Sequence, residues 1–195
     1  MRKLIAVMLG GLALVAAGCG GGGGSGKSAD GAKTTTSGEV PFDQAFVDAM
    51  VPHHRDAIEM AEAAKARGLT QPELVTVADD IVSSQQREID QMLAWREQWF
   101  GSRALGPVLP EVLGVPESEL GMEHGGADEI TAADDVDATF AQMMIPHHEG
   151  AITMAKAAQR DAQHQEVKDL ATAIIAAQKR EIRIMNRYTV GMHHE

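Results

Sequence analysis

The sequence feature that most constrains the fold is an internal repeat. Residues 46–64 return as residues 140–158 at an offset of 94, and 11 of the 19 aligned positions are identical. A second block, residues 85–92, returns as residues 178–185 at an offset of 93, so one residue has been lost between the two blocks. A duplication of this kind predicts two copies of one supersecondary unit, packed against each other.

Each unit is typical of a helix–turn–helix hairpin. We expect helices at about residues 42–66 and 73–99 in repeat 1 (about 41–100), and at about 137–160 and 166–188 in repeat 2 (about 136–195). Pro72 suits the first turn of a helix. The crossover, about residues 101–135, is rich in Gly, Pro and acids, with one short helical turn near 117–120. Because aromatic residues make up only 4% of the chain, a β-sandwich or barrel is not expected. The sequence predicts an all-α domain at 41–195, a four-helix bundle of two duplicated hairpins joined by a long crossover.

The N-terminus is typical of an exported bacterial lipoprotein. A basic start is followed by an apolar run at residues 4–17 and then Ala-Gly-Cys19, the only cysteine of the chain. We expect residues 1–19 to be a lipoprotein signal peptide with lipid attachment at Cys19. The Gly/Ser/Thr-rich residues 20–40 are expected to form a flexible tether. The alternative is a plain secretory signal with an incidental cysteine. Either reading predicts an extracytoplasmic protein, lipid-anchored to the cell membrane in the first case.

The charge balance excludes one class of partner. The chain has 28 acidic and 17 basic residues and a formal net charge of −11. An acidic chain without a basic cluster is not expected to bind nucleic acid.

Polar residues recur on the predicted core faces of both repeats. Heptad stepping puts His53 and Glu88 on core-facing seams in repeat 1, and His147 and Glu181 on the matching seams in repeat 2. A buried imidazole or carboxylate is costly without a partner. We therefore expect His53 and His147 inside the bundle, near Glu88 and Glu181. The seam of the second helix also carries a glutamine in each repeat, Gln85 in repeat 1 and Gln178 in repeat 2.

Two prolines add a second signal. Pro52 and Pro146 precede the histidine pairs His53–His54 and His147–His148 directly. A proline inside a helix removes a backbone hydrogen bond and kinks the helix. The alternative is that each proline begins a new helix. In both cases the second histidine of each pair is expected to flank the seam.

The donor chemistry favours copper. The chain has 11 methionines and 8 histidines; thioethers favour Cu(I), and imidazole serves both Cu(I) and Cu(II). Calcium and magnesium require clustered oxygens, which the seams lack. Zinc remains open through His and Glu. A di-iron site is not expected, because no Glu-x-x-His pair lies on the seams. The alternative to metal binding is a polar network that fixes the helix register.

The repeated motifs resemble a known family. Met-Val-Pro-His-His at 50–54 and Met-Ile-Pro-His-His-Glu-Gly-Ala-Ile at 144–152, followed by Gln-x-x-Glu-Ile-x-x-Met, are similar to the family called domain of unknown function 305. The resemblance implies a ferritin-like four-helix fold in secreted or membrane-attached bacterial proteins, and copper binding or tolerance. By position it implicates as metal ligands Met50, His53, His54, Met60, Glu88, Met92, Met144, His147, His148, Met154, Glu181 and Met185.

The sequence therefore predicts a lipid-anchored protein that buffers or carries copper and is not an enzyme. Its expected partners are the metal ion and, through acylated Cys19, the lipid bilayer. Two rival functions stay open, a ferritin-like oxidoreductase with a copper or iron centre and a metal-free interaction module at the cell surface.

Overall fold

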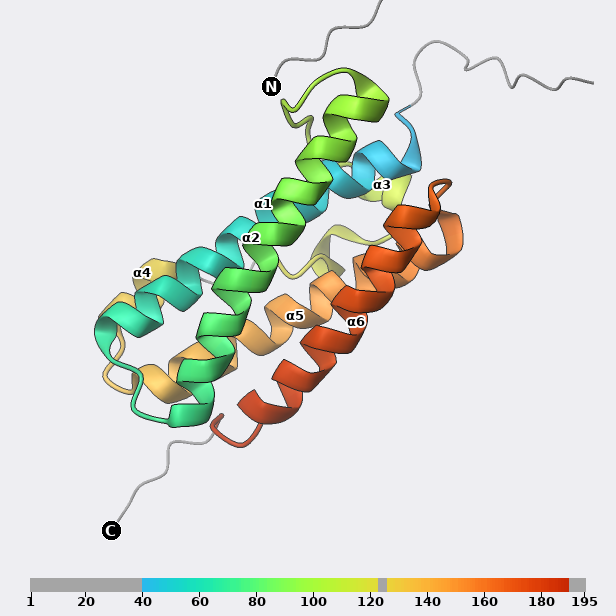
Figure 1. Ribbon diagram of the computed structural model, residues 1–195. Helices are drawn as coiled ribbons and strands as arrows, with labels where there is room; N and C mark the ends of the chain where they lie inside the picture. Colours follow the sequence, from blue (N-terminus) through green and yellow to red (C-terminus); the bar gives the residue numbers. More distant parts are fainter. Residues whose placement is uncertain (1–39, 123–125, 190–195) are drawn as a thin grey trace, which may run out of the picture. The chain divides into compact units, whose positions relative to one another are not determined.

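The computed structural model describes residues 40–122 and 126–189. Cys19, the expected signal peptide and the tether up to residue 39 lie outside the described residues. Described secondary structure is entirely helical. Four long helices, α1 (Phe42–Arg67), α2 (Pro72–Phe100), α5 (Val136–Asp161) and α6 (Gln165–Met185), form the two hairpins expected from the repeat (Figure 1). None of the described helices has both the length and the apolar run needed to cross a membrane.

Short local signals set the helix ends. Gly68 ends α1 in the left-handed conformation, with φ of 95°, which a glycine adopts at little steric cost. Pro72 is the first residue of α2, where its missing N–H removes no hydrogen bond from the helix. Gly101 ends α2 with φ of 78°, and Asp135 caps α5 by accepting a hydrogen bond from the backbone of Ala138.

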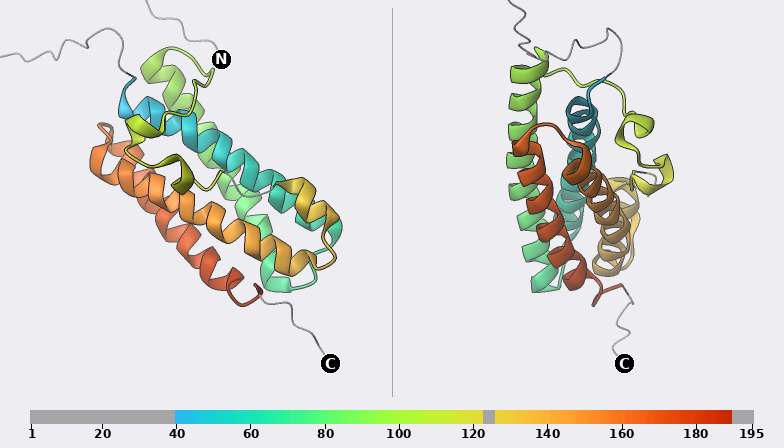
Figure 2. Two further views of the ribbon diagram at one scale, coloured as in Figure 1. Left: turned by 180° about the vertical axis from the view of Figure 1, so that it is seen from behind. Right: turned by 90° about the vertical axis from the view of Figure 1, so that its right-hand side faces the viewer.

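The two hairpins pack against each other through their first helices and through their second helices. α1 contacts α2 within repeat 1 and α5 in repeat 2, and α2 contacts α6. The crossover forms three short elements, α3 (Pro110–Leu113), the 3₁₀ turn η1 (Glu117–Glu119) and α4 (Ala127–Ala132), which contact α1 or α5. The crossover thus lies on the side of α1 and α5 that faces away from α2 and α6 (Figure 2).

Both mid-sequence prolines lie inside continuous helices. Pro52 lies within α1 and Pro146 within α5, so neither begins a new helix. A proline lacks the N–H that would bond to the fourth preceding carbonyl. Buried residues on both sides, among them Met50 and Met144 at 0% exposure, hold each helix together by tertiary packing.

Each repeat caps the second helix of the other. Asp43, near the start of α1, accepts hydrogen bonds from the backbone N–H groups of Gln163–His164 at 2.9 Å each, where α6 begins. Asp137, near the start of α5, accepts in the same way from Thr70–Gln71 at 3.0 and 3.3 Å, where α2 begins. The residue at the N-cap of α2 and of α6 makes no side-chain cap of its own. The carboxylates therefore satisfy helix-end donors across the repeat boundary.

Candidate metal centre

A cluster of four imidazoles, called here the histidine cluster, lies where α1 packs against α5. The rings of His53 and His147 meet with centroids 3.7 Å apart. His54 and His148 follow their neighbours with centroids 6.4 Å away in each repeat. All four side chains are between 0% and 2% exposed. The two His-His motifs, 94 residues apart in sequence, thus form one buried cluster.

In each hairpin, a glutamate on the second helix bonds the second histidine of the His-His pair. Glu88 on α2 lies 2.7 Å from Nε2 of His54, and Glu181 on α6 lies 2.7 Å from Nε2 of His148. The side chains of the two glutamates are 18% and 11% exposed, respectively. The same pair is therefore built twice, once in each repeat.

His53 and His147 lie inside the bundle as expected, at 0% and 2% exposure, but neither is the histidine that a glutamate bonds. The glutamates bond the second histidine of each pair, and the first histidines meet each other instead. The reason is that α1 and α5 each contact two other long helices. Consecutive helix residues differ by about 100° around the axis, so one histidine of a pair faces the opposite repeat and the next faces its own hairpin.

The carboxylates determine which ring nitrogen is available. An ionised carboxylate only accepts, so a neutral His54 or His148 donates from Nε2–H and carries its lone pair on Nδ1. Nδ1 of His54 and Nδ1 of His148 are buried without a hydrogen-bond partner. A histidine that donates one ring N–H to a carboxylate and leaves the other nitrogen open has the arrangement found in metal-binding histidines.

Burial keeps His53 neutral. Loss of hydration is the main cause that lowers the pKa of His53 well below 6.5, and a positive charge on His54 or His148 would lower it further. The backbone carbonyls of Leu120 and His147 act in the opposite direction with smaller effect. A neutral imidazole is the form that binds a metal ion.

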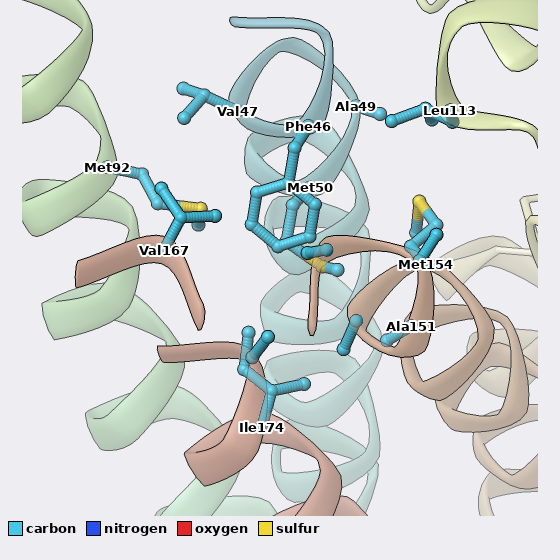
Figure 3. Packing of buried hydrophobic residues seen from close by; sticks show 14 of the residues in the cluster. Phe46, Val47, Ala49, Met50, Met92, Leu113, Ala151, Met154, Val167 and Ile174 are labelled. Carbon is cyan, nitrogen blue, oxygen red and sulfur yellow. The ribbon is translucent and has the colours of Figure 1, made fainter. Parts of the chain in front are cut away.

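The six predicted methionine ligands are buried in two apolar groups, defined here as the methionine sets. The first set comprises Met50, Met92 and Met154, and the second comprises Met60, Met144 and Met185. Figure 3 shows the first set with Phe46, its members coming from α1, α2 and α5. Each set takes two members from one repeat and the third from the other. Along α1, Met50 precedes the histidine cluster and Met60 follows it, so the cluster lies between the sets.

The twelve predicted ligands do not converge on one point. Within the described ranges, no group of three or more His, Cys, Asp or Glu is arranged to hold a metal ion. Glu88 and Glu181 contact imidazoles. The donors are instead distributed as two sets of thioethers on either side of four imidazoles.

The crossover passes directly over the histidine cluster, which sequence reasoning did not foresee. A Cβ added to Gly150 would lie 2.2 Å from the carbonyl oxygen of Leu120. Gly121, at φ of 72°, lies so close to α5 that its Cβ would meet the carbonyl oxygen of Pro146 at 2.9 Å. Beside this contact is a cavity of about 250 Å³ with the carboxylates of Glu119 and Glu149 in its lining. The only available signal was the small residue at position 150.

Comparisons with known proteins identify one family and several similar solved structures. The sequence matches the family described as Domain of unknown function (DUF305) over residues 43–189. CopM in the Cu(I)-bound form is 33% identical with a TM-score of 0.64, covering 78% of this chain and 98% of CopM. CopM in the Cu(II)-bound form is 32% identical at 0.62, covering 75% and 95%. A DUF305 fragment from Deinococcus radiodurans is 27% identical at 0.62, covering 76% and 95%. No curated protein matches the chain.

Proposed function

The chain belongs to the DUF305 family, and from that premise we propose that it binds copper at the histidine cluster and the two methionine sets. The observation that carries the proposal is the pair of open, buried Nδ1 atoms on His54 and His148. Imidazole nitrogen serves both oxidation states of copper, and thioether sulfur favours Cu(I). The similarity to CopM, which has been solved with Cu(I) and with Cu(II), supports the same choice of metal.

Within this proposal, the glutamates orient ligands and do not bind the metal themselves. Glu88 and Glu181 are engaged with the Nε2 atoms at 2.7 Å. Such carboxylates fix the tautomer and ring orientation of a metal-binding histidine and raise its basicity. The proposed donors are therefore imidazole nitrogens and thioether sulfurs. The binding-site role first expected of Glu88 and Glu181 becomes a positioning role.

We propose storage or carriage of copper, and not catalysis. The four imidazoles are at most 2% exposed, and a catalytic metal centre must keep a coordination position open to substrate. A buried site without a coordination position open to substrate suits a buffer or carrier. We further propose that the protein acts outside the cytoplasmic membrane, held there by a lipid on Cys19; this part rests on the sequence of residues 1–19 alone.

The test is copper retention by a tag-free chain. The protein is equilibrated with Cu(I) or Cu(II) against a competing chelator, and the metal is then quantified. Wild type should retain copper, and the double variant His54→Gln/His148→Gln should lose most of it in both oxidation states. His164→Gln is the matched control, because His164 is a partly exposed histidine outside the cluster, bonded to Asp43 and stacked on Trp99. Absence of copper on the wild type, or equal retention by the double variant, would refute the proposal.

A second variant tests the positioning role. In Glu88→Gln/Glu181→Gln the amide can donate to Nε2, which allows the ring proton to move to Nδ1 and removes the lone pair there. We expect copper affinity to fall by about 10- to 100-fold, the usual effect of losing such a partner. Unchanged affinity would contradict the assignment of Nδ1 as the ligand atom.

A further inference from the structure

Two buried glutamines remain unexplained by the copper donors assigned so far. Gln85 on α2 and Gln178 on α6 are each 3% exposed. The side-chain oxygen of each is buried without a hydrogen-bond partner. The two positions are equivalent in the repeat, at the offset of 93. The same unsatisfied group is therefore built into both halves of the protein.

A solely structural role does not account for these amides. A buried acceptor without a partner destabilises the fold, and replacing it with an apolar group of similar shape is close to neutral or favourable. Equivalent core positions on the same helices are occupied by Ile81 and Ile174, at 0% and 1% exposure. Retaining an amide twice indicates that its oxygen has a partner at some stage of function.

The glutamines are adjacent to the histidine-holding carboxylates. Gln85 lies three residues before Glu88, and Gln178 three residues before Glu181. Residues three apart share one face of a helix and are neighbours on it. Each half of the bundle thus combines an open imidazole nitrogen, on His54 or His148, with an open amide oxygen carried next to the carboxylate that holds that imidazole.

We infer that Gln85 and Gln178 supply the oxygen donors through which the protein holds Cu(II). This inference rests on the proposed copper function and adds to it a basis for accepting the oxidised ion. Cu(II) favours nitrogen and oxygen donors, and Cu(I) favours soft sulfur. The imidazoles and amide oxygens suit the first ion, and the methionine sets suit the second. One fold then accommodates copper in either oxidation state by drawing on different donors.

The test compares Cu(I) and Cu(II) affinities in matched glutamine variants. Q85L/Q178L should weaken Cu(II) binding by about tenfold or more and leave Cu(I) binding within about twofold. The electron paramagnetic resonance spectrum of bound Cu(II) should change as well. Without metal, this variant should unfold at a temperature no lower than wild type, because the unsatisfied oxygens are gone. The control is Q86L/Q91L, which makes the same change at two exposed positions of α2.

Q85M/Q178M provides a second measure that does not depend on the leucine variant folding. Methionine keeps an unbranched side chain and replaces the hard oxygen with a soft sulfur. Its ratio of Cu(I) to Cu(II) affinity should rise above that of wild type. If wild type binds copper and the ratio of Cu(I) to Cu(II) affinity is unchanged in the variants, the assignment of the glutamines is overturned and the proposed copper function is not. Failure of wild type to bind copper at all would instead overturn the proposed function.

Discussion

Gly150→Ala tests how tightly the crossover is fitted over α5. The added Cβ would lie 2.2 Å from the oxygen and 2.4 Å from the carbon of the Leu120 carbonyl, and 2.6 Å from the nitrogen of Gly121. An ordinary contact to a Cβ is 3.4–4 Å. All three neighbours are backbone atoms, which cannot rotate aside as a flexible side chain can. The crossover must therefore move by about 1 Å or more.

Two opposing terms determine the size of the effect. Replacing glycine with alanine inside a helix contributes up to about 1 kcal/mol of stability. Overpacking typically costs about 1–3 kcal/mol and more when the neighbours are rigid, and the closest approach here is to backbone. We expect the overpacking term to win, with a net loss of about 1–2 kcal/mol. For a domain of this size that loss lowers the midpoint of thermal unfolding by about 2–8 °C.

The measurement is thermal and urea unfolding of the metal-free protein, followed by far-UV circular dichroism. The control is Asp56→Ala, at the equivalent exposed position of repeat 1. Partial loss of hydration and the charge of Glu59 raise the pKa of Asp56, so its removal should leave stability unchanged or slightly higher. If Gly150→Ala is as stable as wild type, or gains the full alanine contribution, the close contact between Leu120 and α5 is refuted.

Three further outcomes are expected. One variant changes four methionines to leucine, namely Met50, Met60, Met144 and Met154. It should weaken Cu(I) binding much more than Cu(II) binding, and each substitution should cost about 1.5 kcal/mol of stability or less. Equal losses of Cu(I) and Cu(II) affinity in competition titrations would assign the sulfurs to packing. Because the pKa of His53 is lowered in the folded protein, the unfolded chain binds more protons than the folded chain as the pH falls below about 6.5, and stability should decrease there. Urea midpoints measured from about pH 7.5 down to about pH 5.5, which bracket that value, should depend less on pH in His53→Gln than in wild type. Cys19→Ala should release the protein from the membrane fraction or leave it as precursor, and normal cleavage with retained anchoring would contradict lipidation.

The helical fold could be predicted closely from local signals. The expected helices at 42–66 and 73–99 compare with α1 (Phe42–Arg67) and α2 (Pro72–Phe100). The agreement arises because Gly68 and Pro72 mark boundaries by backbone chemistry that depends little on the rest of the fold. The family assignment is confirmed by the match over residues 43–189. The domain boundaries and the lipid anchor stay predictions.

Tertiary neighbours were harder to predict than helices. A single seam per helix placed Glu88 near His53, whereas Glu88 bonds His54, because α1 has two packing partners and a heptad pattern describes one. The same limitation hid Arg96, which lies off the predicted seam yet is 5% exposed and forms a buried ion pair with Asp48 at 2.6 Å. The helices α3 and α4 were missed because their few turns are stabilised by contacts with α1 and α5, not by periodicity.

The reciprocal caps at Asp43 and Asp137 relate the two repeats of this single chain in the way that a two-fold axis relates the subunits of a dimer. Each repeat presents a carboxylate at the start of its first helix and receives one at the start of its second, the self-complementary arrangement of an isologous contact. The hairpin is therefore not the complete unit, since it lacks the cap that its partner provides. A proline at position 163 or 164 would remove a backbone donor from Asp43, about 120 residues earlier in sequence, so a change in one repeat would leave a carboxylate of the other without its partner.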